Sequence, residues 1–209
     1  MEFDDDTQLD GLIDRLKQFI GARPENPTAH YNLGLAFVRK GQLEDAEFAF
    51  KMALELDENM VEAHINLGGL YLRQKKLDEA IAENEKALAI NSHAFLAYNN
   101  IGFARLLQDN LEEAAQAFEK VIEFKPELIP ARLSLARISE RQGDWEAVIA
   151  HYENILDLDP GFALAHYNLA PAFLEKGDPQ KASQHYDQAV ALNYPVDPEL
   201  GQKIQTALG

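Results

Sequence analysis

The chain has 209 residues, no cysteine and a formal net charge of −16. Without cysteine there are no disulfides and no thiolate metal sites, and the acidic excess disfavours nucleic acids and anionic membranes as partners because like charges repel. No apolar run is long enough to span a membrane, and the first ten residues carry acid where an export signal needs positive charge. We therefore expect a cytoplasmic protein that binds neither nucleic acid nor membranes.

The first predicted element is a helix over residues 7–21, within an acidic N-terminal segment 1–26. Counting back one period from the repeat described next places four apolar residues of this helix at positions that pack: Leu12, Leu16, Phe19 and Ile20. We expect the helix to cover the exposed end of the first repeat.

From Pro27 onward the chain aligns with itself in five rows of 34 residues, namely 27–60, 61–94, 95–128, 129–162 and 163–196, without insertion or deletion. A repeat position is counted here from the first residue of each row. Position 8 holds only small residues, and positions 20 and 27 hold small or β-branched residues. They are Gly34, Gly68, Gly102, Ala136 and Ala170 at position 8, Ala46, Ala80, Ala114, Val148 and Ala182 at position 20, and Ala53, Ala87, Val121, Ile155 and Ala189 at position 27. An internal period of this length indicates a stacked helical array.

Each row predicts two helices, an A helix followed by a B helix. The stretch "AHYNLGLAFVRK" has helical spacing of apolar residues, and Gly41 suits the left-handed residue that ends a helix. The stretch "LEDAEFAFKMALEL" restarts the helical period. In the last row, Asp178 and Pro179 provide an N-cap and a first-turn proline for the B helix. Residues 197–209 then form a C-terminal capping helix, in which Leu200, Ile204 and Leu208 are expected to share one apolar face.

The 34-residue period, the small-residue positions and the turn resemble the tetratricopeptide repeat family over residues 27–196. The resemblance implies an all-α, right-handed α-solenoid of helix–turn–helix repeats with a capping helix at both ends. Departures from the family pattern, such as Arg105 and Ser139 at the usually aromatic position 11, are concentrated in the third and fourth rows.

Motifs for catalysis, nucleotide binding or metal binding do not occur in the sequence, so we expect no enzymatic activity and no cofactor. His30, His64 and His166 share position 4, where packing between the A and B helices is expected. His151 and His185 share position 23 and are candidate neighbours on the outer face, although they bring too few ligands for a metal site.

The resemblance implies that positions 2, 5, 6, 9, 12 and 13 of the A helices line a concave groove. Position 6 holds Asn32, Asn66, Asn100 and Asn168, with Ser134 in the fourth row. An asparagine amide can pair with both the C=O and the N–H of a passing peptide, and the set resembles the asparagine ladder of superhelical family members that bind extended peptides. Binding of water alone is the alternative.

Apolar residues and arginines complete the predicted groove. The apolar candidates are Tyr31, Leu35 and Val38 in the first row, Ile65 and Leu72 in the second, Phe103, Leu106 and Leu107 in the third, Leu133 in the fourth, and Tyr167 and Leu174 in the fifth. The arginines are Arg39, Arg73, Arg137 and Arg141, and they favour a ligand with acidic side chains or a free carboxylate. Alternatively, these arginines pair with Glu62 and Glu140 of the chain itself.

Pro171 lies within the predicted A helix of the fifth row, where proline removes a hydrogen bond to Tyr167. A kink and a free carbonyl near the groove are expected there.

These patterns predict a non-catalytic adaptor or scaffold that holds a peptide segment of a partner protein, with apolar and acidic residues, in its groove. Two alternatives remain at this stage. The chain could be an accessory subunit or assembly factor of an enzyme complex, contacting its partner through the acidic B helices, or it could be a self-associating structural scaffold.

Overall fold

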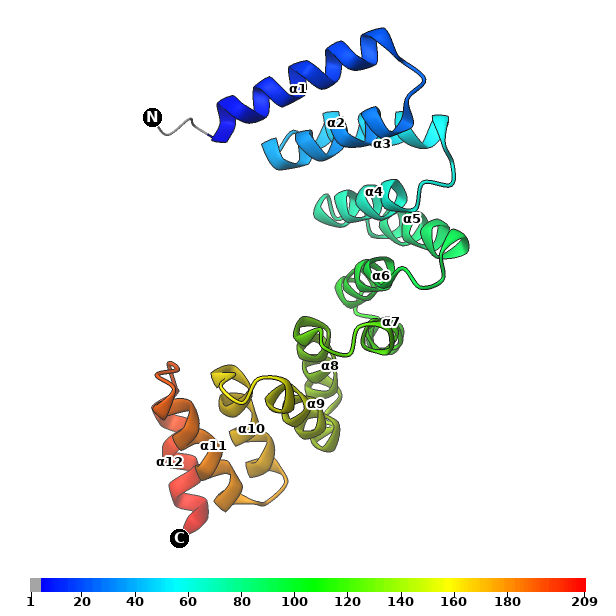
Figure 1. The fold of residues 1–209 in the computed structure, drawn as a ribbon. Coiled ribbons are helices and arrows are strands. Elements are labelled where there is room, and N and C mark those ends of the chain that lie inside the picture. The colour runs from blue at the N-terminus through cyan, green and yellow to red at the C-terminus, as the bar shows by residue number, and fades with distance from the viewer. Residues whose placement is uncertain (1–4) are drawn as a thin grey trace. The chain divides into compact units, whose positions relative to one another are not determined.

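The structure, a computed structural model, describes residues 5–209, with side chains described from Thr7 onward. The described residues form helices and no strands, which confirms the all-α prediction (Figure 1). In chain order the helices are α1 (Asp5–Ala22), α2 (Pro27–Lys40), α3 (Leu43–Leu56), α4 (Val61–Arg73), α5 (Leu77–Ile90), α6 (Phe95–Leu107), α7 (Leu111–Phe124), α8 (Ile129–Gln142), α9 (Trp145–Leu158), α10 (Ala163–Glu175), α11 (Pro179–Ala191) and α12 (Pro198–Leu208). None of these helices is long and apolar enough to cross a membrane.

The helix starts follow the sequence period. The A helices α2, α4, α6, α8 and α10 begin at residues 27, 61, 95, 129 and 163, and the B helices α3, α5, α7, α9 and α11 begin at residues 43, 77, 111, 145 and 179. Capping side chains help to set some of these starts. Asn26 accepts a hydrogen bond from the Ala29 amide before α2, and Asp178 accepts one from the Lys181 amide before α11.

The turn between the A and B helices repeats a left-handed residue at position 15. Gly41, Gly143 and Gly177 have φ values of 76°, 73° and 74°, and Lys75 and Asp109 adopt the same region at 59° and 63°. A side chain in this region costs roughly 1–2 kcal/mol. The two rows without glycine keep the same turn geometry in spite of this cost.

The small residues allow the close helix packing that the sequence predicts. Every residue at positions 20 and 27 is fully buried. A Cβ atom added to Gly34 would lie 2.6 Å from the Phe50 ring, and one added to Gly68 would collide with the Asn84 amide. Any side chain at position 8 of the first two rows would therefore push the A and B helices apart.

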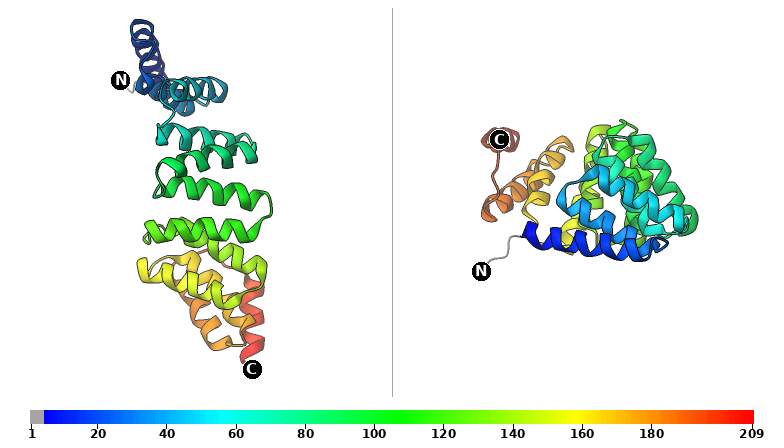
Figure 2. Two further views of the ribbon diagram at one scale, coloured as in Figure 1. Left: turned by 90° about the vertical axis from the view of Figure 1, so that its right-hand side faces the viewer. Right: turned by 90° about the horizontal axis from the view of Figure 1, so that it is seen from above.

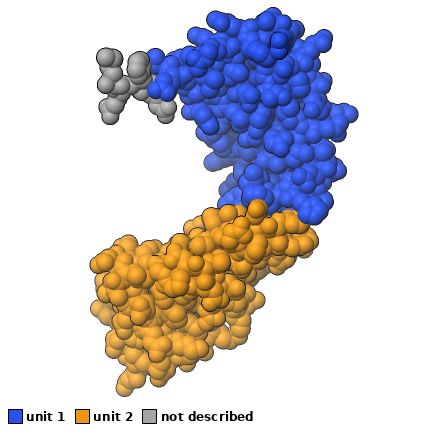
Figure 3. Space-filling model, in the orientation of Figure 1, with its two compact units in different colours: residues 1–114 blue, residues 115–209 orange. Residues whose placement is uncertain are grey.

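The chain divides into two compact units, residues 1–114 and 115–209 (Figure 3). The boundary falls within helix α7. In unit 1 the successive helices stack in layers (Figure 2). The core of this unit includes Phe37, Phe50 and Leu67. In unit 2 the core includes Ile155 and Leu169. Each unit therefore has its own apolar core.

Each end helix packs against the core of its own unit, but two of the expected contacts are missing. In α1, Ile13 is buried against the core of unit 1, and Leu12, Leu16 and Ile20 pack beside it. Phe19 was expected to pack but is exposed, because its ring lies under the Arg23 guanidinium instead, 5.3 Å from it. In α12, Ile204 is buried, whereas Leu208 is exposed in the last turn of the helix, so it does not extend the apolar face.

Helix α10 includes Pro171 and continues without a break from Ala163 to Glu175. The proline has no N–H to donate to the Tyr167 carbonyl. It does not end the helix, and the expected kink stays a prediction.

Candidate functional site

A cavity of about 290 Å³ lies between the A helices of unit 1. Its apolar wall is formed by Val38 of α2, Ile65 of α4 and Leu96 of α6. Its polar wall is formed by Asn66, Arg73 and Asn100. We call this hollow, with Gly69 at its base, the A-helix cavity. It brings together, around one space, residues that the sequence had placed at groove positions of three successive rows.

Gly69 leaves the space open. Position 9 holds Leu35, Phe103, Arg137 and Pro171 in the other rows, so only the second row lacks a side chain there. A Cβ at Gly69 would meet only the Asn100 amide nitrogen, at an ordinary contact distance of 3.6 Å. Glycine within a helix costs roughly 0.5–1 kcal/mol relative to alanine. The second row therefore places no side chain into the A-helix cavity from position 9.

Helix α6 presents an exposed apolar face beside this cavity. Leu96 is 50% exposed, Phe103 37% and Leu107 61%. Their spacing of seven and four residues places them on one side of the helix. Exposed large apolar residues that are grouped in this way mark an interaction surface more often than scattered ones do.

The side-chain amide hydrogens of both asparagines in the cavity are already donated to groups of the protein itself. The Asn66 Nδ2 donates to the Tyr31 hydroxyl at 3.1 Å and to the Glu62 carbonyl at 2.7 Å. The Asn100 Nδ2 donates to the Ile65 carbonyl at 3.2 Å and to the Asn84 Oδ1 at 3.1 Å. Backbone carbonyls only accept, so these contacts fix which amide atom is the nitrogen. At both residues only the Oδ1 acceptor is left for a ligand. The sequence predicts pairing with both the C=O and the N–H of a peptide, and the structure leaves only the pairing with the N–H.

The other position-6 residues are placed differently. Asn32 is exposed on α2, and no hydrogen bond of its side chain occurs among the described residues. The Ser134 hydroxyl donates to the Pro130 carbonyl at 3.1 Å, so it is engaged within its own helix. Asn168 lies in unit 2, where its Nδ2 donates to the Tyr152 hydroxyl at 2.9 Å. Within unit 1 the possible ladder is therefore limited to the first three rows.

Asn84 is a site residue that the sequence reasoning missed. It is fully buried, donates to the Ala80 carbonyl at 2.7 Å and accepts from Asn100. It orients Asn100 from below and so helps to shape the A-helix cavity. The sequence did contain a sign of its special role, because position 24 is aromatic in the four remaining rows. Those aromatic residues are Phe50, Phe118, Tyr152 and Tyr186.

Three of the four predicted arginines lack, within the described part of the chain, the ion pairs expected under the alternative. Among the described residues, Arg39, Arg73 and Arg137 make no ion pair with Glu62 or Glu140. Arg73 lines the A-helix cavity. Arg39 faces helix α1 across another cavity, and Arg141 lies in the last turn of α8.

A second cavity, of about 350 Å³, lies at equivalent repeat positions between α8 and α10 in unit 2. Its walls include Leu133, Leu164 and Asn168, but Arg137 stands where unit 1 has Gly69, and Glu140 lies beside it. Burial, with a smaller contribution from Glu140, raises the pKa of Tyr152 in this cavity to about 12. This hollow is therefore more polar than the A-helix cavity.

The histidines at position 4 have a structural role. Nε2 of His30, His64 and His166 lies 2.9, 3.0 and 3.3 Å from a backbone carbonyl six residues earlier in the chain. His185 lies against His166 of its own repeat, with 3.0 Å between the two Nδ1 atoms. No group of residues in the described part of the chain has the composition of a metal site.

Comparison with known proteins identifies similar folds. The family model described as "Protein kinase G tetratricopeptide repeat" matches residues 19–193. The crystal structure of YrrB, "a TPR protein with an unusual peptide-binding site", is 21% identical with a TM-score of 0.72, and the match covers 85% of this chain and 91% of that one. The crystal structure of MamA is 25% identical with a TM-score of 0.74, and the match covers 81% and 92%.

A match to the Cut9–Hcn1 hetero-tetramer of the APC/C is 16% identical with a TM-score of 0.65, and it covers 97% of this chain and 40% of that one. No curated protein sequence matches the chain. The solved structures confirm the expected α-solenoid of helix–turn–helix repeats.

Proposed function

The chain belongs to the tetratricopeptide repeat family, whose members are typically non-catalytic scaffolds for protein–protein interaction, and on this premise we propose that it binds an extended peptide segment of a partner protein at the A-helix cavity. The observation that carries the proposal is the hollow above Gly69, open beside the exposed apolar face of α6. YrrB, which has a similar fold, is described as having a peptide-binding site.

The size of the cavity and the energies involved favour a peptide over a small molecule. Its volume of about 290 Å³ lies at the lower end of small-molecule pockets and suits the side chains of a peptide. Each apolar side chain buried from water contributes about 1.5–3 kcal/mol. Association costs about 4–15 kcal/mol, so several anchors are needed. Leu96, Phe103 and Leu107 offer further apolar contacts along α6.

Polar groups would set the direction and the composition of the ligand. Oδ1 of Asn66 and Asn100 can accept hydrogen bonds from peptide N–H groups, each contributing about 0.5–1.5 kcal/mol. Arg73 brings to the same wall a guanidinium that has no ion pair among the described residues, which fits a carboxylate on the ligand. The preferred ligand is therefore a segment that carries an apolar residue close to an acidic residue or to its own C-terminus.

Selection of peptides tests this proposal. A displayed library of random peptides is selected on the full chain, and the enriched peptides are measured by calorimetry against Leu96→Gln and, as a matched control, Phe48→Gln. Phe48 is 67% exposed on α3 and lies outside the cavity. We expect enriched peptides to combine apolar and acidic residues, and Leu96→Gln alone to weaken binding by about tenfold or more. Equal binding to all three proteins would contradict the proposal.

We also propose the domain organisation of an N-terminal cap in 1–26, five repeats in 27–196 and a C-terminal cap in 197–209, and a cytoplasmic location. Regular helix starts support this organisation. Self-association is the alternative function, and sedimentation at several concentrations tests it. A chain that acts only as an adaptor should stay monomeric.

A further inference from the structure

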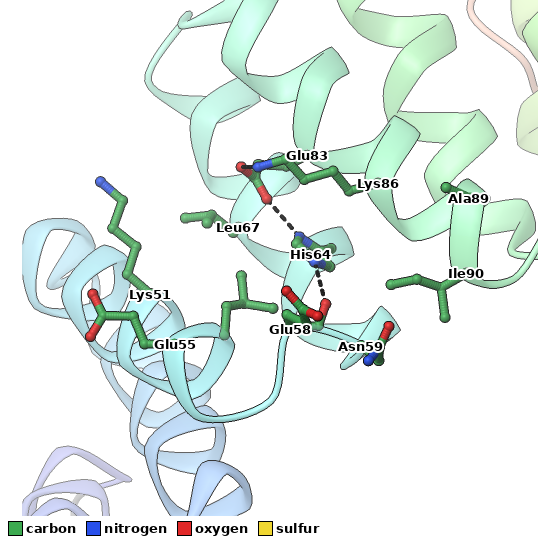
Figure 4. A pocket seen from close by; sticks show the side chains of 11 residues that line it. Lys51, Glu55, Glu58, Asn59, His64, Leu67, Glu83, Lys86, Ala89 and Ile90 are labelled. Carbon is green, nitrogen blue, oxygen red and sulfur yellow. Dashed lines mark hydrogen bonds and ion pairs between the residues drawn. The ribbon is translucent and has the colours of Figure 1, made fainter.

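A larger cavity, of about 560 Å³, opens on the B-helix side of unit 1 and is distinct from the A-helix cavity (Figure 4). It lies between α3 and α5, and the turn before α4 closes one end. We call it the B-helix cavity, and the residues that matter for its chemistry are Leu54, Glu55, Glu58, His64, Glu83 and Ile90. Its volume lies within the range of 300–1,000 Å³ that is typical of ligand pockets.

The floor of the cavity is formed by the largely buried side chains of His64 and Glu83, which contact each other. Nδ1 of His64 lies 2.6 Å from the Glu83 carboxylate, and Nε2 of His64 lies 3.0 Å from the Glu58 carbonyl. Burial by itself would raise the pKa of Glu83, but hydrogen bonds from His64 and Lys86 outweigh it and lower the pKa. The pair links α4 to α5 and fixes the cavity wall. Glu83 is the only acid at position 23, so this floor is particular to the second repeat.

The lysines at the rim are already engaged. The Lys51 ammonium lies 2.7 Å from Glu47 and also over the Tyr71 ring, and the Lys86 ammonium lies 2.7 Å from Glu83. These contacts hold both positive charges against partners of the chain itself. The lysines therefore do not make the cavity a site for anions.

Two acidic residues of the lining have carboxylates that no described residue pairs with. Glu55 and Glu58 are both exposed, and neither has an ion pair among the described residues. Figure 4 shows Glu58 beside His64, with Ile90 on one side of this pair and Glu55 on the other, the Glu55 carboxylate pointing away from Glu58. The apolar part of the lining includes Leu54, Leu67 and Ile90. The charge that the lining leaves without an ion pair in the described part of the chain is therefore negative, and apolar side chains line the same cavity.

We propose that the B-helix cavity is a second docking site, which takes an arginine side chain and an adjoining apolar residue from a partner protein. The alkyl part of arginine packs on apolar surface while its head stays with polar groups. The guanidinium is a planar fork that matches a carboxylate such as that of Glu58, and Glu55 adds a second negative charge to the lining. A partner bound here would leave the A-helix cavity open, so the chain could hold two segments at once.

Titration of the isotope-labelled full chain by NMR tests this site without knowledge of the natural partner. The probe is the blocked peptide acetyl-Ala-Leu-Arg-Ala-Leu-Ala-amide, and its matched control carries glutamine in place of arginine. We expect saturable shifts at residues of α3 and α5, binding that weakens as salt is added, and about tenfold or more weaker binding of the glutamine peptide.

Two variants of equal net charge complete the test. The double variant Glu55→Gln/Glu58→Gln removes both free carboxylates, and Glu85→Gln/Glu153→Gln removes two exposed carboxylates that do not line the cavity. We expect the first to lose about tenfold or more in affinity for the arginine peptide, and the second to bind as the wild type does. Equal binding by both variants, equal binding of both peptides, or shifts confined to α2, α4 and α6 would each overturn the proposal. The peptide-binding proposal concerns the A helices and is tested with Leu96→Gln, so either proposal can fail without the other.

Discussion

Replacing Gly69 by leucine should stabilise the protein and weaken peptide binding at the same time. Gly69 lies inside α4, and a Cβ there makes only an ordinary contact with Asn100. Removing glycine from a helix interior should raise the free energy of unfolding by about 0.5–1 kcal/mol. The rest of the leucine side chain enters the A-helix cavity of about 290 Å³ and occupies the space proposed for the ligand.

The loss of binding follows from the anchor that is displaced. Burial of one apolar side chain contributes about 1.5–3 kcal/mol, so affinity for a selected peptide should fall roughly 10- to 150-fold. Urea unfolding followed by circular dichroism gives the stability, and calorimetry gives the affinity. Gly21→Leu is the control, because Gly21 lies in α1 with no atom within 4 Å of an added Cβ. Unchanged peptide affinity in Gly69→Leu would refute the reasoning.

Three further predictions concern buried polar groups. Asn84→Leu removes the acceptor for Asn100, so the free energy of unfolding measured in urea should fall by about 1–3 kcal/mol. Burial raises the pKa of Tyr152 to about 12, so the stability it contributes is present below pH 10 and should be lost, by about 2–3 kcal/mol, as pH rises through 12. Burial, then His166 and Lys181, lower the pKa of His185 from 6.5, so stability should fall as pH drops below 6.5, which denaturation at several pH values would measure.

Each of these predictions has a matched variant. Asn84→Leu in an Asn100→Ala background should cost less than it costs alone, because the shared hydrogen bond is already gone. Tyr152→Phe should flatten the alkaline loss of stability, and His185→Gln should flatten the acidic loss. Additive costs in the first case, or an unchanged pH dependence in the other two, would contradict the assigned contacts.

The helices could be predicted because their signals are local and repeated. Gly41 marks the left-handed turn directly, and the row alignment extends it to Lys75 and Asp109, which adopt the same φ without being glycine. The spacing of apolar residues gives the buried face of each helix but not what covers its last turn. Phe19 and Leu208 lie in such last turns. The spacing predicts that they pack, but both are exposed.

The site was less predictable, because its shape depends on several helices together. Asn66, Arg73 and Asn100 follow from their repeat positions, and the structure gathers them around one cavity. Gly69 leaves this hollow without a side chain at position 9, and the volume that remains depends on α2, α4 and α6 together, which a pattern of polar and apolar residues does not reveal. The role of Asn84 depends on a contact to the next repeat. The division of the chain at residue 114 also has no counterpart in the uniform period.

Site-specific photo-cross-linking tests the central claim most directly. A benzophenone amino acid is placed at position 96 in the A-helix cavity, or at position 48 on α3, and the selected peptide is irradiated with each protein. If the peptide occupies the A-helix cavity, it should cross-link from position 96 and not from position 48. Cross-links from position 48 alone would contradict the account.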